Sequence, residues 1–356
     1  MLTYNLLFLA GLIGIFNNIK MSTQLVRFNQ FFFIIILSLV IGLRHEVGGD
    51  WLNYYLSYSK FNELNAGQFI EILSLNEPGF KTLIWVSSKI STIYFMHIAN
   101  LLSAFIFLFS LFYFINRFPF TSLLFYISIP FLLIIVAMGY TRQSIGLAFF
   151  MLGILSLNNN KNFNFVILIL IGTLFHKATI FCFIFFIYKN LNLKKLNRII
   201  YMSILAVLFF ILFNDIFSKF LENFLQQEAL ETTGARIKIL INLLFGITYY
   251  LIRKNWNNKL LDIKIMDTYL ILTIIFFAVS IFLSPVYIAA ADRLSIFIYP
   301  INLVVIANYF LVIKKEPLKS GFLFILISVS YIYFITWAIF GSYSRHWLPY
   351  QNVLFI

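Results

Sequence analysis

The stretch Arg44-His45-Glu46-Val47-Gly48-Gly49-Asp50-Trp51-Leu52-Asn53-Tyr54-Tyr55 follows directly on an apolar run from Phe31 to Leu43. The run is part of a segment, 28–43, that we predict to span a membrane as a helix. The polar stretch then collects an arginine, a histidine, two carboxylates and two tyrosines within twelve positions. A turn would need only glycine, asparagine or proline. We therefore interpret this stretch as part of a polar site at one membrane surface.

The composition around this stretch is that of a polytopic membrane protein. Of the 356 residues, 62% are hydrophobic and 11% are charged, and apolar runs recur along the whole length. A bilayer core about 30 Å thick is crossed by roughly 20 apolar residues in a helix. We predict an all-α bundle of about 12 spans that forms a single integral membrane domain over 1–356. The predicted spans are 2–19, 28–43, 99–116, 119–138, 143–157, 163–175, 177–188, 199–213, 237–252, 266–284, 294–313 and 321–338.

Two longer polar segments, at about 44–98 and 214–236, connect predicted spans on one side of the membrane. Within the first segment, residues 80–97 mix lysine and serine with apolar residues. This pattern fits an amphipathic helix on the surface, a re-entrant helix or a further span. The short runs 163–175 and 177–188 could form a re-entrant pair.

Charge is distributed unequally between the two predicted sides. If 80–97 does not cross, the loops of one side carry fifteen basic and three acidic residues, and those of the other side carry eleven basic and ten acidic residues. Cytoplasmic loops of membrane proteins are enriched in lysine and arginine. The polar stretch is therefore predicted to face outward. Since the excess charge lies in short loops at helix ends, we do not expect nucleic acid as a partner.

Other polar residues fall at the same predicted outer ends. They include Arg142-Gln143, His176-Lys177 and Asp292-Arg293. An arginine at the centre of a membrane helix costs roughly 2.5–3.5 kcal/mol on insertion scales, so such residues are read as functional by default. The alternatives are that Arg142 snorkels to lipid headgroups, that Arg293 pairs with a carboxylate, and that His176 caps a short helix.

These residue types indicate anion binding at membrane depth. Arginine binds phosphate through two parallel hydrogen bonds, and a low dielectric strengthens the pairing. A lipid-linked pyrophosphate would present such a group. The sequence has no P-loop, zinc-protease helix or nucleophile elbow, and no Asp-x-Asp pair. With one cysteine, Cys182, and four scattered histidines, we expect no metal site and no cofactor.

The ordered motifs resemble the EpsG/Wzy-type family of bacterial surface-polysaccharide polymerases. The resemblance spans about 40 to 300 and rests on the following residues: Arg44, Gly49-Asp50, Tyr54, Glu77-Pro78-Gly79-Phe80, Arg142-Gln143, Leu147-Ala148, Phe175-His176-Lys177-Ala178, Arg293 and Tyr299. Trp51 departs from the smaller or tyrosine-like residue expected after Asp50.

The resemblance implies an O-antigen or capsule polymerase, a multi-pass glycosyltransferase of the bacterial inner membrane whose active site faces the periplasm. It would transfer a growing glycan from undecaprenyl pyrophosphate to the non-reducing end of a new lipid-linked repeat unit. Flippase and chain-length regulator proteins would be possible partners besides the lipid-linked donor and acceptor.

The roles of individual residues are hypotheses that combine the resemblance with their chemistry. His176 or Asp50 would act as the base, Arg142 and Arg293 would hold the donor pyrophosphate, and Arg44 and Lys177 would help to bind the acceptor. Tyr54, Tyr55 and Trp51 would offer flat surfaces for sugar rings. The remaining predicted substrate-binding residues are Gln143, Glu77 and Tyr299. Two other functions remain open, a flippase or transporter for a lipid-linked glycan and a glycan O-acyltransferase. A flippase would distribute charges through the bilayer depth, and an acyltransferase would place charges at both faces.

Overall fold

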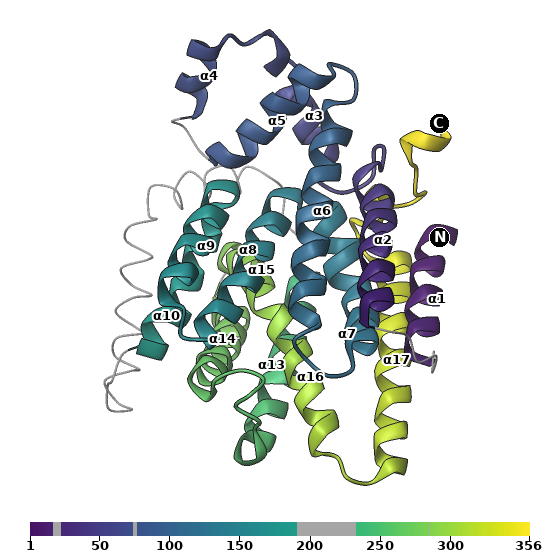
Figure 1. Cartoon of the computed structure of the whole chain (residues 1–356), viewed down its shortest axis with the longest axis vertical. Helices are drawn as coiled ribbons and strands as arrows, with labels where there is room; N and C mark the ends of the chain where they lie inside the picture. Colours follow the sequence, from purple (N-terminus) through teal and green to yellow (C-terminus); the bar gives the residue numbers. More distant parts are fainter. Residues whose placement is uncertain (17–22, 74–76, 191–232, 284) are drawn as a thin grey trace. The chain divides into compact units, whose positions relative to one another are not determined.

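The apolar runs of the sequence form α-helices in the computed structural model, which describes residues 1–16, 23–73, 77–190, 233–283 and 285–356 (Figure 1). No strand occurs in these residues, and the only β-type pairing there is an isolated bridge between Arg44 and Asn352. The predicted all-α class is therefore confirmed for the described chain. The predicted span 199–213 and the outer segment 214–236, up to residue 232, lie outside the described residues.

Six helical segments in the described residues are long and apolar enough to cross a membrane, so the predicted count of about twelve spans is not confirmed. They are Gln24–Gly42, Phe95–Ile115, Gly234–Asn255, Ile263–Phe282, Tyr287–Val312 and Glu316–Phe340. Three further apolar helices are shorter, Leu2–Phe16, Thr121–Ala137 and Asn162–Phe175. The predicted span 177–188 is a 3-10 turn, Lys177–Cys182, followed by the short helix α10, Phe183–Asn190.

The contacts between residues divide the chain into two compact units. The first comprises residues 1–155, 166–180 and 313–356. Its helices are α1 (Leu2–Phe16), α2 (Thr23–Gly42), α3 (Trp51–Tyr58), α4 (Ala66–Leu73), α5 (Pro78–Ile90), α6 (Phe95–Ile115), α7 (Thr121–Ser128) and α17 (Glu316–Phe340). It also holds most of α8 (Thr141–Asn158) and the C-terminal part of α9 (Asn162–Phe175). A π-helical stretch, Ile129–Ala137, continues α7, and Pro130 near its start cannot donate a backbone hydrogen bond.

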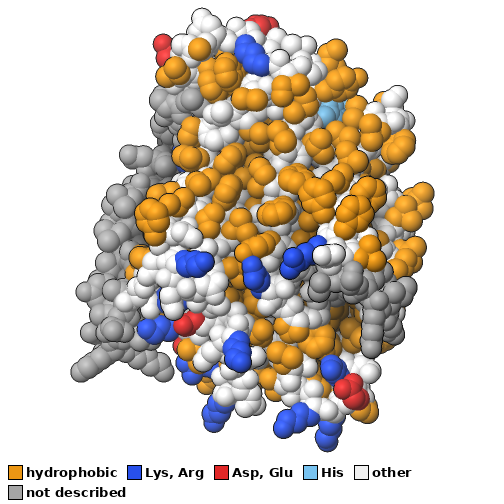
Figure 2. Space-filling view, viewed as in Figure 1, with side chains coloured by type: hydrophobic (Ala, Val, Ile, Leu, Met, Phe, Trp, Pro, Cys, Tyr) orange, Lys and Arg blue, Asp and Glu red, His pale blue; other side chains and the backbone are white. Residues whose placement is uncertain are grey.

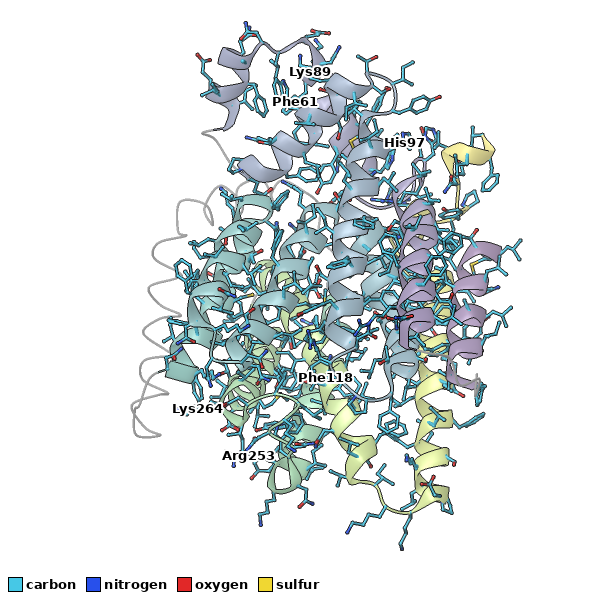
Figure 3. All side chains as sticks on the ribbon, viewed as in Figure 1. Phe61, Lys89, His97, Phe118, Arg253 and Lys264 are labelled. Carbon is cyan, nitrogen blue, oxygen red and sulfur yellow. The ribbon has the colours of Figure 1, made fainter. Side chains whose placement is uncertain are left out.

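The spanning helices of the first unit give it two polar ends. At one end, Gln30 of α2 and Asn116, next to α6, exchange two amide hydrogen bonds of 3.2 and 3.0 Å. At the other end, His45 and His97 lie 3.2 Å apart, so α2 and α6 run antiparallel. Figure 3 shows His97 at one end of α6 and Phe118 at the other.

The sequence assigns Arg117 and Lys319 to the side with the large basic excess and Arg44 to the other side, and these residues lie at opposite ends of this unit. Arg117 and Lys319 lie at the Phe118 end, where the Lys319 Nζ atom is 5.6 Å from the ring centroid of Phe120. Arg44 lies at the His97 end. Which end faces the cytoplasm stays a prediction.

The helices α3, α4 and α5 form the polar segment between α2 and α6. α5 has 13 residues and is therefore about 20 Å long, too short to cross a bilayer core of about 30 Å. Its buried residues Phe80 and Ile84 join an apolar cluster with Tyr54, Phe61 and other residues. At its C-terminal end, the Lys89 Nζ atom donates to the carbonyl oxygens of residues 62 and 64, next to Phe61 (Figure 3). In the structure this is a packed helical segment, and it is not among the six candidate spans of the described residues.

The second unit comprises residues 156–165 and 181–312. Its described helices are α10, α13 (Thr233–Ile252), α14 (Ile263–Phe282), α15 (Pro285–Ser295) and α16 (Tyr299–Val312). Asp262 caps α14 by accepting a hydrogen bond from the backbone N–H of Lys264 over 2.7 Å.

Exposed apolar side chains are abundant on the spanning helices. On α17, Phe324, Ile332 and Phe340 are 71%, 60% and 79% exposed. Figure 2 shows hydrophobic side chains over broad parts of the visible face. Exposed apolar surface on this scale is unusual in a water-soluble monomer and indicates contact with lipid.

Candidate active site

Glu77 is a largely buried carboxylate in the first unit, and other charged residues lie around it. It immediately precedes α5, and Pro78 occupies the first turn of that helix, where its missing N–H costs no hydrogen bond. The backbone of Glu77 is left-handed, with φ of 48°. Residues other than glycine rarely adopt this conformation, and strained backbone of this kind clusters at functional sites. The surrounding structure must therefore stabilise the position of this carboxylate.

Three groups from two other segments bind the Glu77 carboxylate. Arg142, in the first turn of α8, donates from Nη1 to Oε2 over 2.6 Å. His176 follows α9, and its Nδ1 lies 3.0 Å from Oε1. The backbone N–H of Lys177 donates to the same oxygen over 3.3 Å. Because the Glu77 side chain is only 11% exposed, these contacts are largely shielded from water.

Two glycines let α5 and α8 approach the segment around His176. A Cβ atom on Gly79 would lie 3.1 Å from the Cβ of Leu174, near the end of α9. A Cβ atom on Gly146 would lie only 2.3 Å from Oγ1 of Thr179. A side chain does not fit at the second position, so glycine is required there. Both helices can therefore present their first turns to His176.

A chain of hydrogen bonds extends from Glu77 to the opening stretch of the sequence. Arg142 donates from Nε to the Tyr54 hydroxyl over 2.7 Å, and its guanidinium lies 5.0 Å from the centroid of that ring. The Tyr54 hydroxyl in turn donates to Oδ2 of Asp50 over 2.7 Å. Asp50, Tyr54, Arg142, Glu77 and His176 thus form one continuous polar network at one end of the first unit.

The electrostatics of this network favour an ionised Glu77. Burial alone would raise the pKa of Glu77, but the hydrogen bond with His176 and the positive charge of Arg142 outweigh it and lower the pKa to about 2. Nearby Lys81 lies one turn further along α5. The pKa of Lys81 is lowered overall, and burial is the largest cause. Glu77 acts in the opposite direction, and Lys177 and Arg142 lower the pKa further. The Lys81 Nζ atom donates to the carbonyl oxygen of Ile72 over 2.9 Å. Arg142, Lys81 and Lys177 thus lie near one carboxylate, and the excess positive charge suits an anion.

Arg142 retains capacity to bind such an anion. Its printed hydrogen bonds use Nε and Nη1, and its side chain is 35% exposed. Within the described residues, Nη2 has no protein acceptor. A guanidinium can bind a phosphate oxygen through such a group while the carboxylate fixes its orientation.

Arg44 has a different environment from that expected of a ligand-binding arginine. It is 1% exposed and donates from Nε to the carbonyl of Val47 (3.0 Å) and from Nη1 to that of Ile41 (2.6 Å). Its Nη2 donates to Oγ1 of Thr141 (2.9 Å) and Oδ1 of Asn100 (3.4 Å). Arg44 thus joins the end of α2, the following loop, α6 and the start of α8. This geometry favours a structural role over the predicted contact with substrate.

The predicted sugar-binding aromatics also differ in accessibility. Trp51 and Tyr54 are buried at 5% and 6% exposure, whereas Tyr55 is 40% exposed. The rings of Trp51 and Tyr55 stack with centroids 5.5 Å apart. The geometry therefore favours Tyr55 as the open ring and places the other two inside the protein. Gln143 is buried as well.

Arg293 and Tyr299 belong to the second unit, so their predicted place beside Arg142 and His176 stays a prediction. Arg293 is exposed on α15, and Tyr299 is buried at the start of α16. The neighbouring carboxylate, Asp292, forms an ion pair with Lys238 of α13.

Sequence reasoning did not assign Lys81 or Thr141 to the site. Lys81 follows Glu77 by four residues, a spacing that places side chains on one face of a helix. This signal could have been found once Pro78 marked the helix start. Thr141 gave no such signal because its role depends on Arg44, which is remote in sequence.

In the described residues, no group of three His, Cys, Asp or Glu side chains could hold a metal ion.

The fold and the site define a helical membrane protein with an ionised, electropositive cluster at one end of its spanning helices. Comparison with protein families matches residues 28–352 to the EpsG family, and the chain belongs to this family of Wzy-like polymerases. The predicted resemblance is thereby confirmed over nearly the whole chain. No curated protein and no solved structure is significantly similar to it.

Proposed function

We propose that the protein polymerises lipid-linked repeat units of a bacterial surface polysaccharide at the outer face of the plasma membrane. A hydroxyl at the non-reducing end of a new unit would attack the anomeric carbon of the growing glycan. The bond from that carbon to the pyrophosphate of undecaprenyl pyrophosphate would break, and the electron pair would leave with the pyrophosphate. The proton of the attacking hydroxyl would pass to a base. The observation that carries this proposal is the network of Glu77 with Arg142 and His176, in a chain of the EpsG family.

His176 is the proposed base. Its Nδ1 faces the Glu77 carboxylate over 3.0 Å, a contact that holds a proton on Nδ1 and leaves Nε2 as the basic nitrogen. The carboxylate would also stabilise the imidazolium that forms when the hydroxyl loses its proton. Asp50 is the less favoured base because its Oδ2 atom already accepts a hydrogen bond from the Tyr54 hydroxyl.

The leaving pyrophosphate would be bound by Arg142, with Lys81 and Lys177 supplying further positive charge. Donors placed where negative charge develops stabilise a transition state most effectively when little reorganisation is needed. The two hydrogen bonds that fix Arg142 provide this preorganisation. The donor and acceptor are proposed to be undecaprenyl-pyrophosphate-linked oligosaccharides delivered by a flippase, with a chain-length regulator as a further partner.

Complementation of a deletion strain tests this function. Surface glycan from cells carrying His176→Asn or Arg142→Lys should run as single repeat units, whereas the wild-type gene should restore a ladder. Glu63→Gln is a suitable control because Glu63 is an exposed carboxylate in the same polar segment, and it should leave the ladder intact. Absence of any surface unit in the deletion strain would indicate a flippase, and full-length chains would indicate a modifying enzyme. Either result would refute the proposal.

A further inference from the structure

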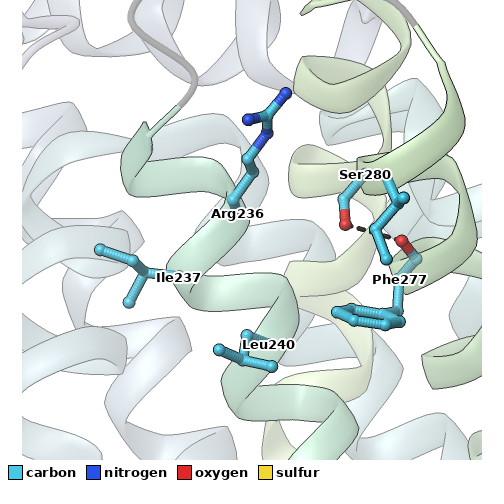
Figure 4. Close-up of a pocket in the computed structure, with 6 residues that line it drawn as sticks. Arg236, Ile237, Leu240, Phe277 and Ser280 are labelled. Carbon is cyan, nitrogen blue, oxygen red and sulfur yellow. Dashed lines mark hydrogen bonds between the residues drawn. The ribbon is translucent and has the colours of Figure 1, made fainter.

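The second unit contains a groove between two of its spanning helices. It lies between the N-terminal part of α13 and the C-terminal part of α14 and has a volume of about 350 Å³. Its lining residues are Arg236, Ile237, Leu240, Phe277, Ser280 and Ile281. Figure 4 shows Arg236 and Leu240 on one helix facing Phe277 and Ser280 on the other. The volume lies within the range of small-molecule sites, about 300–1,000 Å³.

The walls of the groove are apolar and accessible. Ile237, Leu240 and Ile281 are 48%, 42% and 54% exposed, and all three belong to segments long and apolar enough to span the membrane. The Ser280 hydroxyl donates to the carbonyl of Phe277 over 2.7 Å, so it already has a partner. The groove therefore presents hydrocarbon to the bilayer along most of its length.

Arg236 provides the charged end of this groove. It is exposed in the first turn of α13, one turn before Leu240. Within the described part of the chain, no ion pair or hydrogen bond involves Arg236, whereas Lys238 on the same helix is paired with Asp292. A cation beside an apolar groove at a helix end matches a lipid whose phosphate lies at the interface and whose chain lies deeper.

We propose that this groove binds one anionic phospholipid, with the phosphate on Arg236 and an acyl chain against Leu240 and Phe277. An anionic lipid suits an arginine that has no carboxylate partner among the residues that the structure describes. The headgroup of a zwitterionic lipid carries its own positive charge, which would weaken the attraction of its phosphate to Arg236. This site does not depend on the proposed polymerase reaction.

Native mass spectrometry of the full chain in mixed phosphatidylglycerol and phosphatidylcholine micelles tests the proposal. The wild-type protein should retain one phosphatidylglycerol in preference to phosphatidylcholine. Arg236→Gln should weaken phosphatidylglycerol retention about five-fold, equivalent to about 1 kcal/mol. Lys254→Gln is the matched control, because it removes an exposed positive charge just beyond the other end of α13, and it should retain the lipid like wild type.

A second variant tests the apolar part of the groove without changing charge. Leu240→Trp should fill the groove and abolish retention of the bound phosphatidylglycerol. Equal retention by wild type, Arg236→Gln and Leu240→Trp would overturn the proposal, as would equal retention of the two headgroups by the wild-type protein.

Discussion

Replacing Glu77 with glutamine tests the centre of the proposed site most sharply. Glutamine has nearly the same shape, but it removes the charge that binds Arg142 and His176 and puts an NH₂ group toward one of two donors. Lowering of the Glu77 pKa from 4.5 to about 2 corresponds to about 3 kcal/mol of interaction with the charged form. We therefore expect Glu77→Gln to destabilise the fold by up to about 3 kcal/mol.

The effect on catalysis should exceed the effect on folding. If Glu77 orients His176 and stabilises its imidazolium, losing it removes much of the general-base contribution, typically 10² to 10⁴-fold. Activity per folded molecule should thus fall at least about 100-fold. The assay is polymer formation by purified protein, normalised to the folded fraction from size-exclusion chromatography.

The pH dependence of stability gives an independent check on the same residue. A carboxyl whose folded pKa is depressed stabilises the fold above its unfolded pKa, and this stabilisation is lost as pH falls through the folded value. The stability difference between wild type and Glu77→Gln should be fully present just above about pH 5. It should shrink as the pH falls from 4.5 toward 2. A difference that is unchanged at pH 3, or wild-type activity in the variant, would refute this reasoning.

Other variants separate structural from substrate-binding roles. Arg44→Lys loses at least two buried hydrogen bonds and should lower the stability of the fold by about 3 kcal/mol in total. Thr141→Val should lower it by about 1 kcal/mol. Thermal unfolding measures both effects, and unchanged unfolding temperatures for both variants would contradict the structural role. Tyr55→Ala should raise KM for the acceptor about five-fold, whereas Tyr55→Phe should not, and equal KM values would remove Tyr55 from acceptor binding. Lys81→Gln should raise KM for the pyrophosphate donor up to about five-fold at low salt and less at high salt; a salt-independent effect would argue against an electrostatic role.

The helical class and the family could both be predicted from the sequence because both depend on local patterns. Apolar runs and the ordered motifs around Arg142 and His176 are visible without a fold. The convergence of these two residues on Glu77 requires α5 and α8 to meet the end of α9, which depends on close packing at Gly146.

The burial and hydrogen-bond partners of individual side chains were harder to predict than the helices on which they lie. Arg44 and Trp51 have the residue types of a binding site, but tertiary packing buries both. An arginine that satisfies carbonyls at the ends of several helices looks the same in sequence as one that binds phosphate. The predicted count of about twelve spans is not confirmed for a related reason, because hydropathy does not distinguish a full span from short helices such as α9 and α10.

In vitro polymerisation from a defined undecaprenyl-pyrophosphate-linked repeat unit is the most direct test of the catalytic role of the Glu77 cluster. Purified wild-type protein in nanodiscs should produce a glycan ladder and release one undecaprenyl pyrophosphate for each new linkage. Folded His176→Asn and Glu77→Gln proteins should produce neither, and Glu63→Gln should match wild type. Ladder formation at the wild-type rate by either of the first two variants would contradict the account.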